Sequence, residues 1–298
     1  MESKHNLQEV SGFEDVVSIN PDKLPAIAES IEDVIPTTNQ YILKHYFWQA
    51  VLLTLVSLVL TIFLLNFAGK ELGELTLLPL AVPFIAYGWC RDRIQGVFMQ
   101  QFACANGFNY QRHGPHQISE EGSIFNRGRA QKIFNIVDGT FLHYPLRLFN
   151  YRHTIGSGRQ NKTFQYTVFE LVFAANLPKI YLDAHKSSTE KVSGWRIAGA
   201  KRIELESNDF NKQFSLWIEE GRHIEALQIF APDFMDELLH LPGKFDLEII
   251  GNQIYIYDDG IIRTKARLRE MFQLAKHLME NLGYVLEQMR VSRGRGRV

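Results

Sequence analysis

The stretch from Tyr46 to Gly69 contains no charged side chain and reads YFWQAVLLTLVSLVLTIFLLNFAG. A helix of about 20 apolar residues spans the roughly 30 Å hydrocarbon layer of a membrane. A helix in a soluble core is seldom apolar on every face over such a length. This stretch therefore predicts a transmembrane helix over residues 46–68.

A second apolar run, LTLLPLAVPFIAYGWC, extends from Leu75 to Cys90 after the short polar connection KELGE. It contains Pro79 and Pro83, and neighbouring helices can satisfy the backbone carbonyls that such prolines leave without a donor. We therefore expect a second membrane span over about residues 72–90, which would complete a transmembrane helical hairpin over residues 46–93. The alternative is a re-entrant or interfacial segment.

Basic residues flank the two runs unequally. Lys44 precedes the first run, Arg91 and Arg93 follow the second, and the connection carries only Lys70. Because cytoplasmic flanks are enriched in Lys and Arg, this distribution predicts a multi-pass protein with both termini in the cytoplasm. Two cysteines in the whole chain are typical of a reducing compartment.

The net charge of −1 conceals an asymmetry between the two ends of the chain. Residues 1–45 form an acidic tail, whereas basic residues outnumber acidic ones in residues 91–298. Within the tail, residues 21–36 place apolar side chains at helical spacing, which predicts a short amphipathic helix. Its polar face is acidic, so we expect it to pack on protein rather than on a membrane surface.

Residues 94–289 are predicted to form a cytoplasmic domain of the α+β class, with a mainly antiparallel sheet. The second membrane helix continues to a stop at Asn106–Gly107, and a final helix with one apolar face spans about residues 264–289. A turn at Gly251–Asn252 predicts a hairpin. Segments rich in β-branched and aromatic residues predict strands over residues 132–139, 140–153, 162–174, 179–184, 202–207 and 214–219.

The sequence Gly156-Ser157-Gly158-Arg159 resembles either a phosphate-binding loop or the turn of a hairpin. Phosphate loops of the common kinds follow a strand and open a helix, whereas here a second strand pattern follows. The context therefore favours a hairpin loop. Basic residues still crowd its tip and could contact lipid headgroups or an acidic partner. The candidate binding residues are Arg152, Gly156, Gly158, Arg159 and Lys162.

The final segment, residues 290–298, is rich in arginine and glycine. Its arginines could attract anionic lipid, or the segment could be a solvated tail. Binding of nucleic acid is a third alternative, but residues 91–298 are only mildly basic, which disfavours it. The candidate residues for contact with an anionic surface are Arg290, Arg293, Arg295 and Arg297.

No catalytic or cofactor motif is present in the sequence. The only imaginable metal ligands near one another are Cys104, His113 and His116, and their spacing matches no zinc pattern, so we expect neither a metal nor a cofactor. An active site assembled from distant residues is a separate hypothesis. Its candidate residues are His143, His153 and Asp183.

Five segments, in their order along the chain, are similar to those of a known family. They are YRHTIGSGRQNKTFQYTVFEL (151–171), LPKIYLDAHK (177–186), DFNKQFSLW (209–217), ALQIFAPDFMDELL (226–239) and FDLEIIGNQIYIY (245–257). The chain resembles uncharacterised bacterial membrane proteins with two N-terminal transmembrane helices and a cytoplasmic α+β domain of unknown function. The resemblance implies a location in the bacterial inner membrane, and it implies no catalytic residues. The acidic tail and the arginine-glycine segment are not part of it.

These observations lead to one principal functional hypothesis and two alternatives. The principal one is a non-enzymatic, membrane-anchored cytoplasmic binding or scaffold protein. Its expected partners are the lipid bilayer and either an unidentified protein or a second copy of the chain. The alternatives are a membrane-bound enzyme with a dispersed site, and a membrane tether that holds anionic lipid or nucleic acid through the basic tail.

Overall fold

The computed structural model describes residues 38–115, 121–157, 160–185, 199–241 and 244–295. The predicted amphipathic helix over residues 21–36 lies outside these ranges. The helical elements, in chain order, are α2 (Thr38–Leu72), η3 (Gly73–Ala81), α3 (Val82–Ala105), α4 (Asn208–Gln213), α5 (His223–Ile229), α6 (Pro232–His240) and α7 (Lys265–Arg295). The strands are β1 (Asn109–His113), β2 (Arg129–Phe141), β3 (Tyr144–Ile155), β4 (Lys162–Ala184), β5 (Ala200–Ile203), β6 (Phe214–Glu219) and β7 (Asp246–Asp259).

The seven strands form one sheet in the described part of the chain, with the order β1-β2-β3-β4-β6-β5. The seventh strand, β7, also pairs with β4, and every pairing is antiparallel. The long strand β4 joins the halves of the sheet. Its residues 162–171 pair with β3 and its residues 180–184 pair with β6, whereas β7 pairs with it along most of its length, from Tyr166 to Leu182. The predicted α+β class is therefore confirmed.

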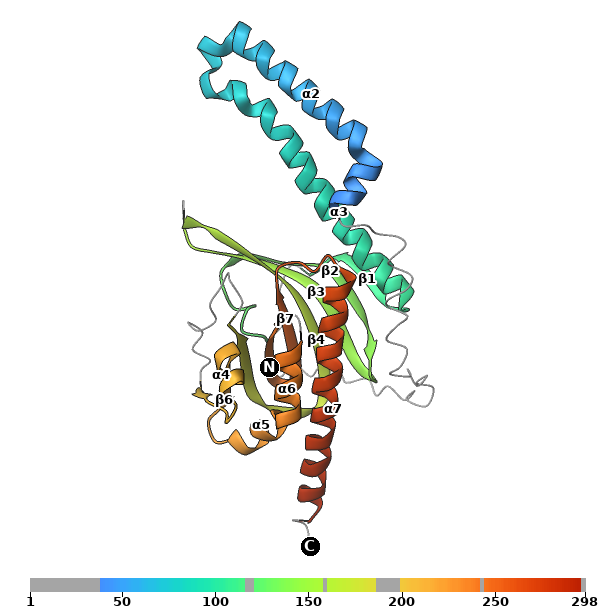
Figure 1. Ribbon diagram of the computed structural model, residues 1–298, viewed down its shortest axis with the longest axis vertical. Helices are drawn as coiled ribbons and strands as arrows, with labels where there is room; N and C mark the ends of the chain where they lie inside the picture. Colours follow the sequence, from blue (N-terminus) through green and yellow to red (C-terminus); the bar gives the residue numbers. More distant parts are fainter. Residues whose placement is uncertain (1–37, 116–120, 158–159, 186–198, 242–243, 296–298) are drawn as a thin grey trace, which may run out of the picture.

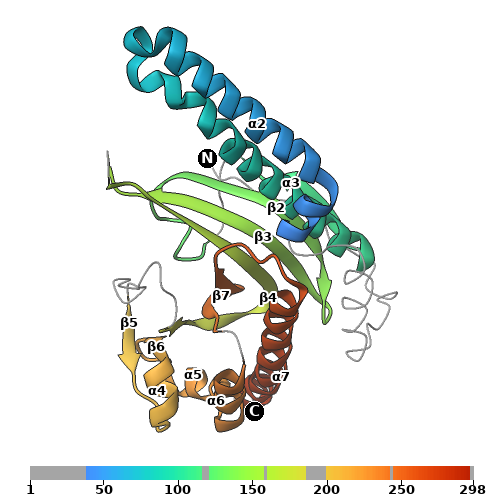
Figure 2. The same ribbon diagram turned by 45° about the horizontal axis from the view of Figure 1, so that its top comes forward.

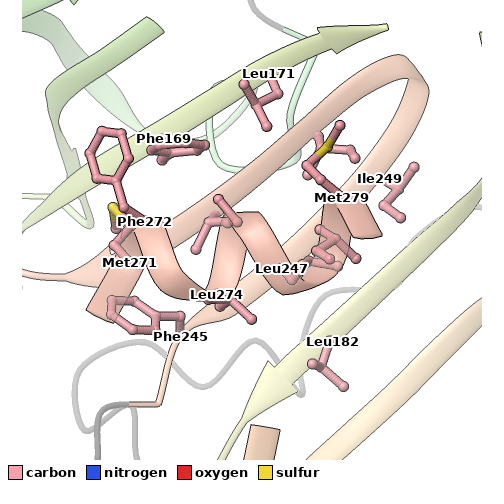
Figure 3. Close-up of a cluster of buried hydrophobic side chains, with 14 of the residues drawn as sticks. Phe169, Leu171, Leu182, Phe245, Leu247, Ile249, Met271, Phe272, Leu274 and Met279 are labelled. Atoms are coloured by element: carbon pink, nitrogen blue, oxygen red, sulfur yellow. The ribbon is translucent and has the colours of Figure 1, made fainter. Parts of the chain in front are cut away.

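Helices α3 and α7 pack on one face of the sheet and share the main apolar core. Figure 1 shows the arrangement of these elements, and Figure 3 shows the part of the core between α7 and strands β4 and β7. The last turns of α3 contribute Phe98, Met99 and Phe102, which are at most 4% exposed. The ring centroid of Phe102 lies 5.7 Å from that of Phe272 on α7. Burial of such large apolar side chains is the dominant favourable contribution to folding.

Tyrosines and carboxylates lie on the opposite face, where residues 121–127 cross the sheet. Phe125 packs edge-on against Tyr151 and Tyr255. The backbone N–H of Ser123 donates to the Glu248 carboxylate at 2.9 Å, and the Tyr257 hydroxyl donates to the same carboxylate at 2.7 Å. The segment is thus held by buried hydrogen bonds as well as by aromatic packing.

The predicted hairpin turn at Gly251–Asn252 is wrong. Residues on both sides of Gly251 belong to the single strand β7, which stays paired with β4 through register shifts near Leu177. Gly251 has φ of +58°, a conformation that glycine adopts readily, so the strand bends there instead of reversing. The bend follows that of its long partner β4, which the local sequence could not reveal.

The first apolar run forms α2, in which Tyr46–Phe67 is long and apolar enough to cross a membrane by length and composition. It is the one such helix among the described residues. The predicted continuous second span over residues 72–90 is not found, because this run divides between η3 and the start of α3. Pro79 and Pro83 explain the division, since neither can donate an intrahelical hydrogen bond.

The helical hairpin of α2, η3 and the first half of α3 (the helical hairpin from here on) projects from one end of the sheet domain (Figures 1 and 2). Its surface is apolar, and Trp48, Phe67 and Phe84 are each 78% exposed. Its buried side chains include polar ones, among them Ser57 and Thr76. The sheet domain has the opposite distribution, because its large apolar side chains are buried.

Candidate functional site

A cavity of about 100 Å³ opens where α3 leaves the helical hairpin and meets the sheet domain. Four elements line it: α3, β1, β2 and the connection between β7 and α7. We call it the basic pocket, and its basic residues are Arg112, His113, Lys132 and Arg263. Its other lining residues are Gln95, Phe134, Asn135 and Ile261.

The polar residues of the pocket wall are held in place by hydrogen bonds. The buried Gln95 donates from Nε2 to the carbonyl of Ile262 at 2.7 Å, which fixes the connection that carries Ile261 and Arg263. The N–H of Ile262 in turn donates to Thr167 Oγ1 at 2.8 Å. This connection is therefore a fixed wall of the pocket, attached to both α3 and β4.

A bulge in β2 sets the position of Asn135. The register between β2 and β3 shifts between Phe134 and Val137, and Asn135 has φ of +52°. Asparagine tolerates this left-handed conformation better than most residues. Its Oδ1 accepts a hydrogen bond of 2.9 Å from the Tyr110 hydroxyl, and burial raises the pKa of that hydroxyl, although the nearby charge of Arg112 lowers it in part. Bulges of this kind often occur next to functional sites.

Gly96 allows β1 and β2 to approach α3 closely beside the pocket. A Cβ at this position would lie 3.1 Å from the Tyr110 hydroxyl oxygen and 4.0 Å from the guanidinium carbon of Arg112. The absence of a side chain at Gly96 therefore brings the basic strand β1 against the helix that leads to the helical hairpin.

The charge of the pocket is one-sided, because its lining includes three permanent cations and, among the residues that the structure describes, no carboxylate. Arg112 and Lys132 are exposed, and within the described ranges neither forms an ion pair. Arg152 adds to this charge, since it is the Cα partner of Lys132 and lies on the same face of the sheet. Such a concentration of positive charge attracts anions.

The predicted binding residues at the β3–β4 tip do not form one cluster. Arg152 pairs with Gln165 and Lys162 pairs with Ile155, so alternation along β3 places Arg152 and Lys162 on opposite faces. Gly156 has φ of +98°, and a Cβ there would lie 2.4 Å from the carbonyl oxygen of Gln160. The loop joins two strands, as predicted for a hairpin. Gly158 and Arg159 lie outside the described residues.

The three residues of the hypothetical dispersed active site are not brought together. His143 directly precedes β3 and His153 lies near the other end of that strand, so the two are about 33 Å apart at the usual rise of a strand. His153 is fully buried and stacks between the rings of Phe164 and Tyr166, with centroids 5.5 Å and 5.8 Å away. This particular trio is therefore wrong as an active site.

No group of three potential metal ligands is found among the residues that the structure describes. Cys104 lies exposed on α3 and His113 lies on β1. His116 lies outside the described residues, so the full trio of Cys104, His113 and His116 is not placed.

Buried carboxylates gather where β4 and β7 meet β6, on the tyrosine-rich face. Burial raises the pKa of Asp246 to about 8, although a hydrogen bond from the Ala184 N–H lowers it in part and the neighbouring Asp183 raises it further. That hydrogen bond is 2.8 Å long. Burial also raises the pKa of Glu248, which Ser123 and Tyr257 lower in part as donors. These hydrogen bonds indicate a structural role in joining β4, β7 and residues 121–127.

The predicted basic tail continues the C-terminal helix. α7 has 31 residues, about 46 Å at 1.5 Å per residue, and includes Arg290, Arg293 and Arg295 in its backbone; Arg297 lies outside the described residues. The helix begins near the sheet end that carries the helical hairpin and runs away from it (Figure 1). The C-terminal end of α7, which includes Arg293 and Arg295, therefore lies away from the helical hairpin.

Sequence reasoning missed the basic pocket. Its cations come from three separate segments, and no short motif contains more than two of them. The one local signal was the run of basic and polar residues directly after the Asn106–Gly107 stop. The pairing of β1 with β2, and the bulge at Asn135, had no signal in the sequence.

Comparisons with known proteins identify no family for this chain. No family model matches it, and no curated protein matches it. The crystal structure of the mycobacterial trehalose monomycolate transport factor A, TtfA, is similar at a TM-score of 0.48 and 11% identity. The similarity covers 63% of this chain and 94% of that chain. Likeness at this level defines neither the class nor the function of the chain.

Proposed function

We propose that the protein is a non-enzymatic, membrane-anchored binding module, with its sheet domain held at the cytoplasmic face of the membrane. The main support for this proposal is that α3 is one continuous helix shared by the helical hairpin and the sheet domain. A single helix starts at Val82, where its neighbours are apolar and exposed, and ends with Phe102 buried in the core of the sheet domain. A rigid helix shared by both parts holds the domain at a fixed distance from the anchor.

In this proposal both arms of the helical hairpin enter the bilayer. The first arm is α2, and the second arm is η3 with the first half of α3. The hydroxyl of Ser57 on α2 donates to the carbonyl of Pro79. In a regular α-helix this carbonyl would accept from the residue four positions later, which is Pro83 and has no N–H. A donor from the adjacent helix supports membrane insertion of the second arm, because unsatisfied backbone groups are costly in lipid.

The charges that follow the second arm support a cytoplasmic location of the sheet domain. Arg91 and Arg93 follow it in sequence, and the basic pocket lies on the same side. Basic residues are enriched on the cytoplasmic side of membrane proteins. The proposed location is a bacterial inner membrane, which rests on the family resemblance of the sequence.

A protein partner or a second copy of the chain is the other ligand that we propose. In the described residues β1 and β5 are the two edges of the main strand order. β1 has exposed side chains at four of its five positions. An exposed edge strand can add a strand from a partner.

Membrane fractionation of the full chain tests the anchor. We expect the protein to stay with the membrane after an alkaline wash. The double variant Leu55→Asp/Val59→Asp should be released, because each charge near the centre of a span costs about 3 kcal/mol. Both residues are exposed on α2. The control Ile224→Asp/Leu227→Asp changes exposed apolar residues of α5 and should stay bound. Equal behaviour of the two variants would contradict the proposed anchor.

A further inference from the structure

We propose that the basic pocket binds the phosphate group of an anionic lipid, whose headgroup belongs to the leaflet next to the sheet domain. The inference deepens the proposed function and rests on it, since the membrane anchor supplies the lipid. Arg112, Lys132 and Arg263 converge on the cavity, and its lining in the described ranges contains no carboxylate. An anion relieves the mutual repulsion of Arg112 and Lys132, and a phosphate accepts several hydrogen bonds from guanidinium and ammonium groups.

The depth of the pocket matches the headgroup region. Trp89 on α3 is exposed and lies at the end of the second apolar run, as is typical of residues at the interface of a bilayer. Gln95 lines the pocket six residues later on the same helix, which corresponds to about 9 Å along the helix axis. The pocket therefore lies just outside the hydrocarbon layer if Trp89 marks its boundary. Basic pockets in this position bind lipid headgroups in membrane proteins.

The construction of the pocket also fits a phosphate diester. Among its lining residues the side chains of Arg112 and Lys132 are exposed, whereas the polar residues Gln95 and Asn135 are buried. Phe134 and Ile261 provide apolar walls for the part of the headgroup that adjoins the phosphate. Asn135 has a left-handed backbone, and Gly96 has no side chain where β1 approaches α3. Strained backbone positions of this kind are frequent at functional sites.

Binding of a monomeric lipid to the full chain in detergent tests the inference. The probe is dioctanoyl phosphatidylglycerol, with dioctanoyl phosphatidylcholine and glycerol 3-phosphate as comparisons, and the readout is the dissociation constant from thermal shift. We expect phosphatidylglycerol to bind more tightly than either comparison. The variant Arg112→Glu/Lys132→Glu should weaken its binding about tenfold or more.

A matched charge control separates the pocket from general attraction. Lys179→Glu/Lys201→Glu makes the same change in net charge at two exposed lysines of β4 and β5, and should bind as the unchanged protein does. The milder variant Arg112→Gln/Lys132→Gln keeps the test valid if the double reversal fails to fold. Equal weakening in pocket and control variants, or no weakening in either, would overturn the proposal.

The comparison ligands test the source of the phosphate. If glycerol 3-phosphate bound as tightly as phosphatidylglycerol, the proposal that a lipid supplies the bound phosphate group would be wrong. Because the assay uses monomeric lipid in detergent, a failure here leaves the membrane anchor untouched. The opposite combination, lipid binding in detergent but no membrane retention in the fractionation experiment, would contradict the anchor and not the pocket.

Discussion

The helical hairpin and the sheet domain place their apolar side chains in opposite directions. In the helical hairpin, residues such as Trp48 and Phe84 are exposed, whereas Ser57 and Thr76 are buried. In the sheet domain, Phe102 and Phe272 are buried, whereas lysines such as Lys132 and Lys201 are exposed. The same helix, α3, belongs to both parts. The difference teaches that one continuous helix exposes large apolar side chains in its first half and buries them in its second.

The largest effect on the free energy of unfolding should come from the buried half of α3. Phe102→Ala removes a ring that is fully buried against Phe108 and Phe272, and should lower the free energy of unfolding by about 3–5 kcal/mol because it leaves a cavity. Phe84→Ala changes an exposed ring in the other half of the same helix. It should leave the unfolding of the sheet domain in detergent unchanged. Similar losses in both variants would remove the distinction between the two halves.

Arg267 at the start of α7 should give the second largest effect. Its Nε lies 3.1 Å from Asp258 Oδ1 and its Nη1 lies 2.9 Å from Glu270 Oε2, and its guanidinium carbon lies 3.8 Å from the centre of the Phe245 ring. Arg267→Ala leaves a buried carboxylate without its partner and should cost about 3 kcal/mol in chemical denaturation. Arg269→Ala, at an exposed position two residues later, is the control and should cost less than about 0.5 kcal/mol. Equal costs would contradict the role of this ion cluster.

The buried carboxyl of Asp246 should make the stability of the sheet domain depend on pH. Its folded pKa of about 8 lies above the value of 3.8 that it has when exposed. The folded state therefore binds more protons, and stability falls as pH rises from about 4 to about 8 and then levels off. Asp246→Asn keeps an oxygen that can accept from the Ala184 N–H and removes this contribution.

Thermal unfolding at several pH values measures this effect. The melting temperature of Asp246→Asn, relative to that of the unchanged protein, should rise by several degrees between about pH 5 and pH 8. Asp233→Asn, at an exposed position of α6, should show no such trend. A constant difference across the pH range would show that Asp246 is not protonated in the folded state.

The smallest effect should come from the polar contact inside the helical hairpin. Ser57→Ala removes the donor to the Pro79 carbonyl and should weaken the association of the two arms in lipid nanodiscs by about 0.6–1 kcal/mol. Thr54→Ala removes only a bond to Ala50 on the same helix and should have less effect on the association. Fluorophores on α2 and α3 would measure it by energy transfer. A larger effect from Thr54→Ala would contradict the role of Ser57.

Local patterns in the sequence predicted the elements but not how distant elements meet. The uncharged run, the Asn106–Gly107 stop and the apolar face of the last helix each depend on neighbouring residues, and the structure contains α2, the end of α3 and α7 at those places. α7 continues to Arg295, beyond the predicted end at residue 289. Gly251 had the local signature of a turn, but pairing with the long strand β4 kept β7 extended.

The candidate site depended almost entirely on tertiary pairing. Arg112, Lys132 and Arg263 are separated along the chain, and only the β1–β2 ladder and the Gln95–Ile262 hydrogen bond bring them to one cavity. The crowding of basic residues at the β3–β4 tip was visible in the sequence. Strand alternation then placed Arg152 and Lys162 on opposite faces, which a count of charges could not predict.

Thiol labelling of membrane vesicles tests most directly whether both arms of the helical hairpin cross the bilayer. In a Cys90→Ser background, the exposed Cys104 reports on the sheet domain, and Ser11→Cys reports on the N-terminal segment. A membrane-impermeant maleimide should label both positions in inverted vesicles and neither in right-side-out vesicles. Labelling of the two positions from opposite sides would show that α2 crosses alone, and would contradict the account.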